Sequence, residues 1–289
     1  MGRIIAVANQ KGGVGKTTTA VNLAASLGAL ERKTLLVDID PQGNASSGVG
    51  VGGPDVESKQ IYHVLLGERP IREVIYETAI PHLKILPATA DLIGFEIEAL
   101  DLPERESLLK SALASVAEEY EYILIDCPPS LSLLTVNALT AADSVLVPLQ
   151  CEYFALEGLG RLVGTIDLVA RSLNPKLSLE GIVLTMFDRR NNLAHQVAKE
   201  VSDHFGPKLW ETRIPRNVRL SEAPSFGKPI LLYDIRSAGA QAYLALAEEF
   251  LRRGKTISVG GTNERAKESA GTRDLVADPG LSAGPTATD

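Results

Sequence analysis

The stretch NQKGGVGKTT, residues 9–18, lies between an apolar, β-branched run at residues 4–8 and a helical pattern at residues 18–27. Its three glycines let backbone N–H groups turn inward around an anion, where a side chain would obstruct the turn or the anion. The helix that starts near Lys16 adds the positive end of its dipole. Strand, glycine-rich loop and helix in this order predict a phosphate-binding loop; the alternative is a glycine-rich turn that only starts a helix.

Polar side chains at the end of this loop have separate predicted roles. Lys16 is long enough to reach the β- and γ-phosphates of a nucleotide. The Thr17 hydroxyl is placed to ligate Mg²⁺, and the Thr18 hydroxyl is placed to bond a phosphate. The loop residues predicted to bind nucleotide are Gly12, Gly13, Val14, Gly15, Lys16, Thr17 and Thr18.

Two further strand patterns end in acidic residues. The run YILID, residues 122–126, has the Walker B form, and Asp126 is predicted to hold Mg²⁺ through a water. The run LLVDID, residues 35–40, places Asp38 and Asp40 on one side of a strand end, at the phosphate cleft or its edge. A carboxylate there can hold a Mg²⁺-bound water or orient an attacking water. The alternative, strongest for Asp38, is a strand-end aspartate that caps the next turn.

Short apolar runs alternate with helical patterns along the chain, which predicts an α/β fold. We expect a doubly wound, mostly parallel sheet flanked by helices, with ligands bound at the carboxyl ends of the strands. The runs that read as strands cover residues 4–8, 34–37, 122–125, 144–147 and 179–184. The helical patterns that are clearest cover residues 18–27, 105–117 and 240–253.

The domain organisation follows from composition. Residues 1–253 are predicted to form one compact α/β domain that carries the phosphate-binding loop. Residues 254–289 hold 16 Gly, Pro, Ser or Thr and no aromatic residue, and we expect this tail to be disordered. The chain shows no secretory signal pattern and no apolar stretch of about 20 residues, so a cytoplasmic protein is expected. Its only cysteines, Cys127 and Cys151, lack the close spacing of a zinc or redox pair.

The loop departs from the ordinary pattern, because Gln10 stands where a glycine is required and Lys11 follows it. The run KGGVGKTT, residues 11–18, resembles the deviant Walker A loop of the family that includes ParA, MinD and the nitrogenase iron protein. In those relatives the first lysine crosses a dimer interface to the partner's nucleotide. The resemblance therefore implies that Lys11 binds nucleotide and joins two ATP-bound subunits, with ATP and Mg²⁺ as cofactors.

The resemblance to the chromosomal ParA/Soj branch continues nearly to residue 253. It rests on DPQGN at 40–44, DCPPS at 126–130, QCEYFALEG at 150–158 and IPRNVRLSEAP at 214–224. It implies that Asp40 acts on the hydrolytic water with Asp38 in support, and that Pro215 and Asn217 border the adenine. The residues implied in catalysis are Lys11, Lys16 and Asp40. Phosphoryl transfer needs little covalent help from the protein, and slow hydrolysis is tolerable where ATP cleavage only sets how long a state lasts. We therefore expect a weak ATPase.

DNA binding has to be reconciled with a formal net charge of −7. Residues 186–236 contain nine Lys or Arg against six Asp or Glu, a balance of +3, which leaves −10 for the rest of the chain. This asymmetry locates a candidate basic face that would bind phosphates without reading sequence. The main candidates are Arg189, Arg190, Arg216 and Arg219, and matching positions in Soj relatives point most strongly to Arg190 and Arg219.

The resemblance implies a partition ATPase whose ATP dimer holds nonspecific DNA at the nucleoid and is stimulated by a ParB-like centromere-binding protein. A MinD-like membrane-cycling ATPase is the alternative, but it needs a terminal basic amphipathic helix, which the glycines at 260–261 and Pro279-Gly280 would break. A nucleotide-dependent filament without turnover stays open. The iron-protein branch needs cysteines that share a cluster, and Cys127 and Cys151 lack the surrounding pattern.

Overall fold

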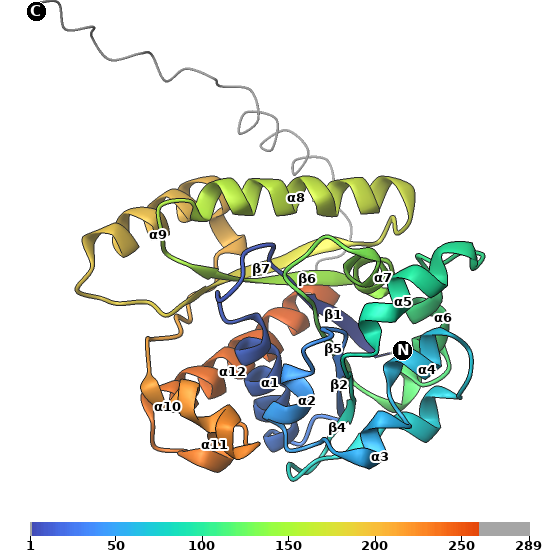
Figure 1. The fold of residues 1–289 in the computed structure, drawn as a ribbon. Helices are drawn as coiled ribbons and strands as arrows, with labels where there is room; N and C mark the ends of the chain where they lie inside the picture. Colours follow the sequence, from blue (N-terminus) through green and yellow to red (C-terminus); the bar gives the residue numbers. More distant parts are fainter. Residues whose placement is uncertain (1, 260–289) are drawn as a thin grey trace, which may run out of the picture.

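The computed structural model describes residues 2–259, in which seven strands form one sheet in the order β3-β4-β2-β5-β1-β6-β7 (Figure 1). Every neighbouring pair is parallel except β3 with β4. The strands are β1 Arg3–Val7, β2 Thr34–Asp38, β3 Tyr76–Glu77, β4 Leu83–Leu86, β5 Tyr122–Asp126, β6 Ser144–Gln150 and β7 Ser178–Thr185. The predicted doubly wound α/β fold is confirmed.

Helices cover both faces of the sheet (Figure 1). The α-helices are α1 Lys16–Ala29, α2 Asn44–Gly48, α3 Pro54–Glu57, α4 Ile61–Leu65, α5 Leu92–Glu98, α6 Leu108–Ala114, α7 Leu133–Ala141, α8 Ala155–Ser172, α9 Asn192–Phe205, α10 Val218–Glu222, α11 Ile230–Tyr233 and α12 Ala238–Val259. Short 3-10 turns are η1 Ile71–Val74, η2 Ala99–Asp101, η3 Ala117–Glu119, η4 Gly206–Lys208 and η5 Ala223–Phe226.

Side chains of the central strands alternate between two hydrophobic cores, which is why these runs read as continuously apolar. In β1, Ile4 and Ala6 join the core under α4 to α9, whereas Ile5 and Val7 join the core under α1 and α12. The same alternation in β5 sends Ile123 to the first core and Leu124 to the second. Parallel strands buried on both faces therefore hold the sheet at the centre of the molecule.

Two predicted helices have different bounds in the structure. The pattern at residues 105–117 forms the shorter α6, because Val116 and Ala117 stay buried in the turn beyond the helix and so extend the apolar periodicity. The last helix, expected to end at Arg253, continues to Val259. Residues 254–259, predicted to belong to the disordered tail, therefore continue α12. The rest of that prediction, residues 260–289, lies outside the described residues.

Buried polar contacts tie α1 to the carboxyl-terminal elements. The hydroxyls of Thr19 on α1 and Tyr243 on α12 lie 3.2 Å apart within hydrogen-bond geometry. The Ile230 N–H, at the start of α11, donates to Oδ1 of Asn22 on α1 at 2.7 Å. These contacts hold α11 and α12 against the helix that follows the glycine loop.

No helix among residues 2–259 is long and apolar enough to cross a bilayer.

A close packing contact positions the segment that follows η4. The Trp210 side chain is buried, and its backbone N–H donates to the Ile182 carbonyl of β7 at 2.9 Å. A Cβ added at Gly181 would overlap the Trp210 indole nitrogen and lie 2.5 Å from its Cδ1. Gly181 therefore gives the indole its place on the edge strand.

We predict opposite effects for two glycine-to-alanine substitutions. Gly181→Ala should lower the free energy of unfolding by about 1–3 kcal/mol, because the buried indole has to move. Gly164→Ala, at an exposed position within α8 where an added Cβ meets nothing, should raise it by about 0.5–1 kcal/mol through helix propensity. Urea denaturation measures both, and a neutral Gly181→Ala would contradict the packing argument.

Candidate active site

The glycine loop connects β1 to α1 at the carboxyl edge of the sheet. Gly13 and Gly15 have φ of 74° and 87°, in the left-handed region that favours glycine. None of the N–H groups of residues 12–15 donates to a protein acceptor in the described structure. These unpaired donors, together with the first turn of α1, form a cradle for an anion.

Lys16 lies inside the loop with 7% of its surface exposed. Its Nζ donates to the Lys11 carbonyl at 3.0 Å. Burial lowers the pKa of Lys16, whereas the nearby Asp126 and Asp40 carboxylates act in the opposite direction. An anion in the loop would give this ammonium a charged acceptor in addition to the neutral carbonyl.

Asp126 ends β5 as a fully buried carboxylate, and neither of its oxygens forms a hydrogen bond of good geometry, although the Thr17 hydroxyl lies near enough to act on its charge. Burial, followed by the charge of Asp38, raises the pKa of Asp126 well above its usual range; the Thr17 hydroxyl and the Lys16 charge oppose this rise. Buried polar atoms without partners are rare, and oxygen ligands suit Mg²⁺. The donor set of Asp126 and Thr17 therefore fits a Mg²⁺ ion at this strand end.

The loop that follows β2 occupies the carboxylate of Asp38, which still lies close enough to Asp126 to raise its pKa. Its Oδ1 accepts from the Asp40 N–H at 3.1 Å, and its Oδ2 accepts from both the N–H and the hydroxyl of Ser46 at 2.8 Å. Burial raises the pKa of Asp38 to about 6, against the bonds from Ser46. The turn-capping alternative thus describes Asp38, which orders the loop that carries Asp40.

Asp40 lies just beyond β2 and is 7% exposed. Its Oδ1 accepts from the Gln42 N–H at 3.0 Å. The charge of Asp40 contributes to the pKa shifts of both Lys16 and Asp126, so the three groups share one electrostatic environment. The structure therefore brings Asp40 together with the loop lysine and the strand-end carboxylate.

Lys11 lies at the surface of the loop, half-exposed, and forms an ion pair with Glu152 in the β6–α8 connection. The next two residues, Tyr153 and Phe154, are 79% and 64% exposed, and their rings pack edge to face. Sequence reasoning did not single out Glu152. An acidic residue within the QCEYFALEG block was the only signal for it in the sequence. The ion pair with Lys11 could not be read from the sequence, because it joins residues separated by 141 positions.

A cavity of about 300 Å³ lies beside the glycine loop. Gly13, Gly15 and Thr18 line it together with Pro215 and Asn217, so the residues predicted for phosphate and base share one space. The Asn217 Oδ1 caps α10 by accepting from the Arg219 N–H at 3.0 Å, which leaves the Asn217 amide nitrogen for a ligand.

Thr185 is a lining residue of this cavity that sequence reasoning missed. Its hydroxyl donates to the Val14 carbonyl at 2.8 Å and so fixes the glycine loop against the end of β7. The predicted strand stopped at Leu184, one position short of β7, and a polar residue at a strand end was the signal that could have identified it.

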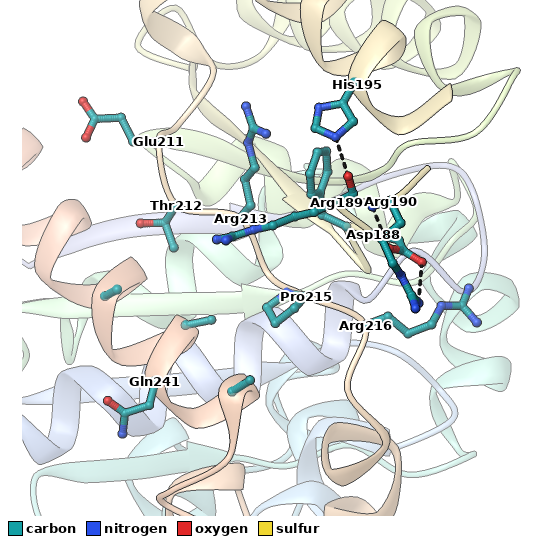
Figure 2. Close-up of a pocket in the computed structure, with 14 residues that line it drawn as sticks. Asp188, Arg189, Arg190, His195, Glu211, Thr212, Arg213, Pro215, Arg216 and Gln241 are labelled. Carbon is teal, nitrogen blue, oxygen red and sulfur yellow. Dashed lines mark hydrogen bonds and ion pairs between the residues drawn. The ribbon is translucent and has the colours of Figure 1, made fainter. Parts of the chain in front are cut away.

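A larger groove of about 1140 Å³ adjoins this cavity, and we call it the arginine groove. Its basic lining residues are Arg189, Arg190, Arg213 and Arg216 (Figure 2). Arg219 does not line it; this side chain lies on α10 and pairs with Glu222 at 2.9 Å and Asp234 at 3.7 Å. The structure thus brings three of the four predicted DNA-binding arginines together and adds Arg213.

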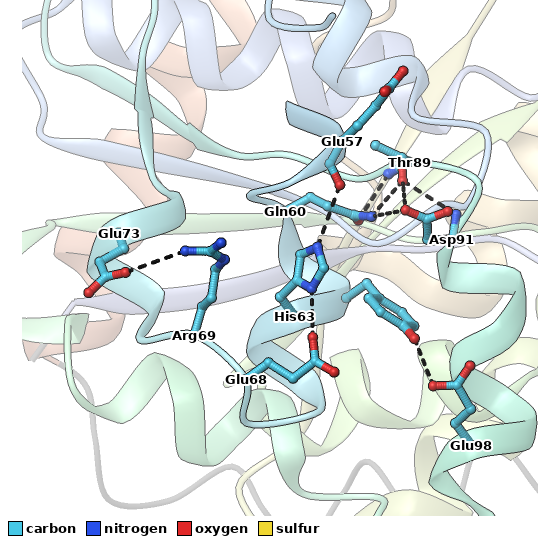
Figure 3. Close-up of polar contacts among 10 residues, drawn as sticks. Glu57, Gln60, His63, Glu68, Arg69, Glu73, Thr89, Asp91 and Glu98 are labelled. Atoms are coloured by element: carbon cyan, nitrogen blue, oxygen red, sulfur yellow. Dashed lines mark hydrogen bonds and ion pairs between the residues drawn. The ribbon is translucent and has the colours of Figure 1, made fainter. Parts of the chain in front are cut away.

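A separate polar cluster around α4 is satisfied by its own members (Figure 3). The buried Gln60 amide donates to the Thr89 hydroxyl and to Asp91 at 2.6 and 2.8 Å. His63 pairs with Glu68 at 2.7 Å. Within residues 2–259 no group of three or more His, Cys, Asp or Glu is arranged to hold a metal ion. We therefore read the cluster of Figure 3 as a structural network.

Residues 2–179 match a family model described as an AAA domain. The chain is 60% identical over 253 residues to the chromosome partitioning protein ParA of Myxococcus xanthus, covering 88% of this chain and 89% of the relative. It is 56% identical to the sporulation initiation inhibitor protein Soj of Bacillus subtilis, covering 88% and 100%. Among solved structures, cobyrinic acid a,c-diamide synthase from Mycobacterium smegmatis with bound ADP and magnesium matches with a TM-score of 0.77 at 39% identity, covering 89% and 96%.

We predict that Asp126→Asn stabilises the protein in the absence of nucleotide and Mg²⁺. The substitution removes a buried charge without a partner, so the free energy of unfolding should rise by about 1–3 kcal/mol at neutral pH. Because the folded-state pKa of Asp126 is raised, the penalty in the wild type fades as the pH falls toward the unfolded value of about 4, and the gain should shrink with it.

Urea denaturation between pH 4 and 8 measures this difference. The control is Asp101→Asn, at an exposed carboxylate, which should change stability by less than about 0.5 kcal/mol. A destabilised Asp126→Asn protein at neutral pH would contradict the assignment of an unpaired buried charge.

Proposed function

This chain belongs to the ParA/Soj family of chromosome-partitioning ATPases, and from that premise we propose that ATP closes two copies into a dimer that holds DNA nonspecifically until hydrolysis releases it. The observation that carries the proposal is the unpaired carboxylate of Asp126, buried beside the Thr17 hydroxyl at the mouth of the glycine loop. ATP hydrolysis then sets how long the dimer persists. A ParB-like centromere-binding protein stimulates that step, and the protein acts at the nucleoid.

The unpaired N–H groups of residues 12–15 and the ammonium of Lys16 receive the phosphates of ATP. Thr17 and Asp126 would hold Mg²⁺, and a magnesium ion there would supply positive charge against the phosphates. The base enters the cavity of about 300 Å³ between the loop and the segment of Pro215 and Asn217. The related structure with bound ADP and magnesium supports this choice of ligands.

Asp40 orients the attacking water, because it lies in the same electrostatic environment as Lys16 and Asp126. Asp38 contributes indirectly, since its three accepted hydrogen bonds order the loop from Asp40 to Ser46. Positioning of water without a strong base is consistent with slow turnover.

Dimerisation uses the open surface around Lys11. If the Lys11 ammonium leaves the Glu152 carboxylate and pairs with a phosphate of the partner's nucleotide, it joins the two copies. The neighbouring rings of Tyr153 and Phe154 offer apolar surface that a dimer would bury. A face of this kind is self-complementary when two copies meet about a two-fold axis.

We predict that Asp40→Ala accumulates as a dimer with MgATP, because the nucleotide is bound and not cleaved. Adding Lys11→Ala should return the protein to a monomer that still binds ATP, and Lys16→Ala should abolish ATP binding. Sedimentation velocity and a fluorescent ATP analogue measure the two properties. The control is Asp40→Ala with Lys33→Ala, which alters an exposed lysine away from the loop and should stay dimeric. A monomeric Asp40→Ala protein saturated with MgATP would refute the dimer switch.

DNA binding uses the basic face formed by residues 186–236. Arg190 and Arg219 are held by carboxylates in the free subunit, Arg190 by Asp188 at 3.2 Å and Arg219 by Glu222 at 2.9 Å. These exposed pairs are weak, so a phosphate can compete for either guanidinium. Two such faces on one dimer would raise avidity without new contacts.

We predict that the protein retains duplex DNA at least about 10-fold more tightly with a nonhydrolysable ATP analogue than with ADP, and that log affinity falls linearly with log salt. Arg190→Glu with Arg219→Glu should abolish retention, whereas Arg161→Glu on α8 serves as the matched charge reversal and should retain most of it. Fluorescence anisotropy on a duplex of arbitrary sequence measures each case. Equal retention with the ATP analogue and ADP is the result that the proposal cannot accommodate.

Sedimentation with anionic liposomes separates the membrane-cycling alternative from DNA binding. The proposed function expects no nucleotide-dependent pelleting of the full chain.

A further inference from the structure

We propose that the arginine groove seats one phosphodiester backbone of DNA and that Arg213 is a phosphate-binding residue within it. The inference rests on the proposed DNA binding and adds a site and a residue to it. The alternative occupant of a basic groove is an acidic protein segment, and the experiment below separates the two.

The groove has the size and the charge for a phosphate backbone. Its volume of about 1140 Å³ is far larger than the cavity beside the glycine loop. Arg190 and Arg216 lie on one side of Pro215, Glu211 and Gln241 lie on the other side, and Arg213 lies between Arg189 and Glu211 (Figure 2). Glu211 is partly neutralised by Arg252 at 3.7 Å. An extended polyanion is therefore attracted to one wall of the groove.

Three guanidinium groups of the groove are available without breaking an ion pair. Within residues 2–259, the side chains of Arg189, Arg213 and Arg216 make no hydrogen bond or ion pair with a protein carboxylate, whereas Arg190 is held by Asp188. An unpaired guanidinium that already lies in a groove binds a phosphate without first losing a partner. The groove thus presents a preformed set of phosphate-binding groups.

Of these three arginines, Arg213 has the side chain that is best held by its neighbours. Its guanidinium lies over the ring of the buried Phe187, with Cζ 4.5 Å from the ring centroid. Stacking leaves the edge of the guanidinium, with its N–H donors, free for an acceptor. The backbone beneath it is also fixed, because the Phe187 N–H donates to the Ile214 carbonyl at 2.9 Å. Arg213 therefore loses little side-chain freedom when a phosphate binds.

The groove shares a wall with the base cavity, which connects it to the nucleotide. Pro215 and Arg216 line both spaces, one face of the segment turned toward the glycine loop and the other toward the arginines. Contact of a bound base with Pro215 acts on the same backbone that carries Arg213 and Arg216. The groove is therefore placed to respond to the nucleotide within one subunit.

Asp188 opposes phosphate binding from inside the groove. Its carboxylate accepts from the Arg190 backbone N–H at 2.9 Å and from the Arg190 side chain at 3.2 Å. It holds Arg190, attracts Arg216 and repels a phosphate at short range. Neutralising Asp188 should consequently strengthen the groove, a change opposite in sign to the loss of Arg213.

The test measures duplex affinity by fluorescence anisotropy at several salt concentrations, with the full chain and a nonhydrolysable ATP analogue. Arg213→Gln should weaken binding about 5-fold and reduce the slope of log affinity against log salt by about 1 per subunit. Asp188→Asn should tighten binding by about 3-fold. Arg171→Gln, at an exposed arginine on α8 outside the groove, is the matched control and should change neither quantity. Thermal melting confirms that each variant is folded.

The outcomes separate the groove from the proposed function. If the wild type retains duplex and Arg213→Gln has the same affinity and the same salt slope, the groove proposal is wrong and the proposed DNA binding stands. Wild-type protein that retains no duplex with any nucleotide overturns the DNA binding and the groove together. A decaglutamate peptide that binds in an Arg213-dependent manner, without competition from duplex, overturns the groove proposal in favour of an acidic protein segment.

Discussion

A carboxylate buried without a well-formed hydrogen bond is unfavourable, and Asp126 is such a group at the end of β5, the middle strand of the sheet. The surrounding charges are arranged about it: Lys16 is buried nearby, and Asp38 raises its pKa further. The free subunit therefore keeps a region that a cation and an anion together would stabilise. The glycine loop, with unpaired N–H groups on residues 12–15, adds the complementary part for the anion.

The rest of the fold serves to hold these groups at one edge. Parallel strands buried on both faces bring the ends of β1, β2 and β5 side by side, so that the loop, Asp40 and Asp126 meet although they are distant in sequence. Thr185 fixes the loop to β7. Beyond β7, the packing of Trp210 on Gly181 anchors the segment that leads to Arg213 and Arg216.

Local patterns in the sequence were sufficient to predict the sheet's core strands, the glycine loop and Asp126, because each depends on neighbouring residues. The short strands β3 and β4 were missed, since two or four residues carry no periodic signal. Contacts made by the folded chain could not be predicted from the sequence either. The Asp38 carboxylate accepts hydrogen bonds from Ser46, Lys11 pairs with Glu152, and Arg219 lies on α10 away from the groove. The catalytic, nucleotide-binding and DNA-binding assignments stay predictions.

The buried hydrogen bonds of α1 have a mechanical consequence. Thr19 and Asn22 of this helix bond Tyr243 and the Ile230 N–H, so sliding α1 against α12 and α11 would leave polar groups unpaired in the interior. A displacement of α1 would therefore carry α11 and α12 with it. A shift of the phosphate loop that precedes α1 would thereby be transmitted through packed helices rather than through a flexible hinge.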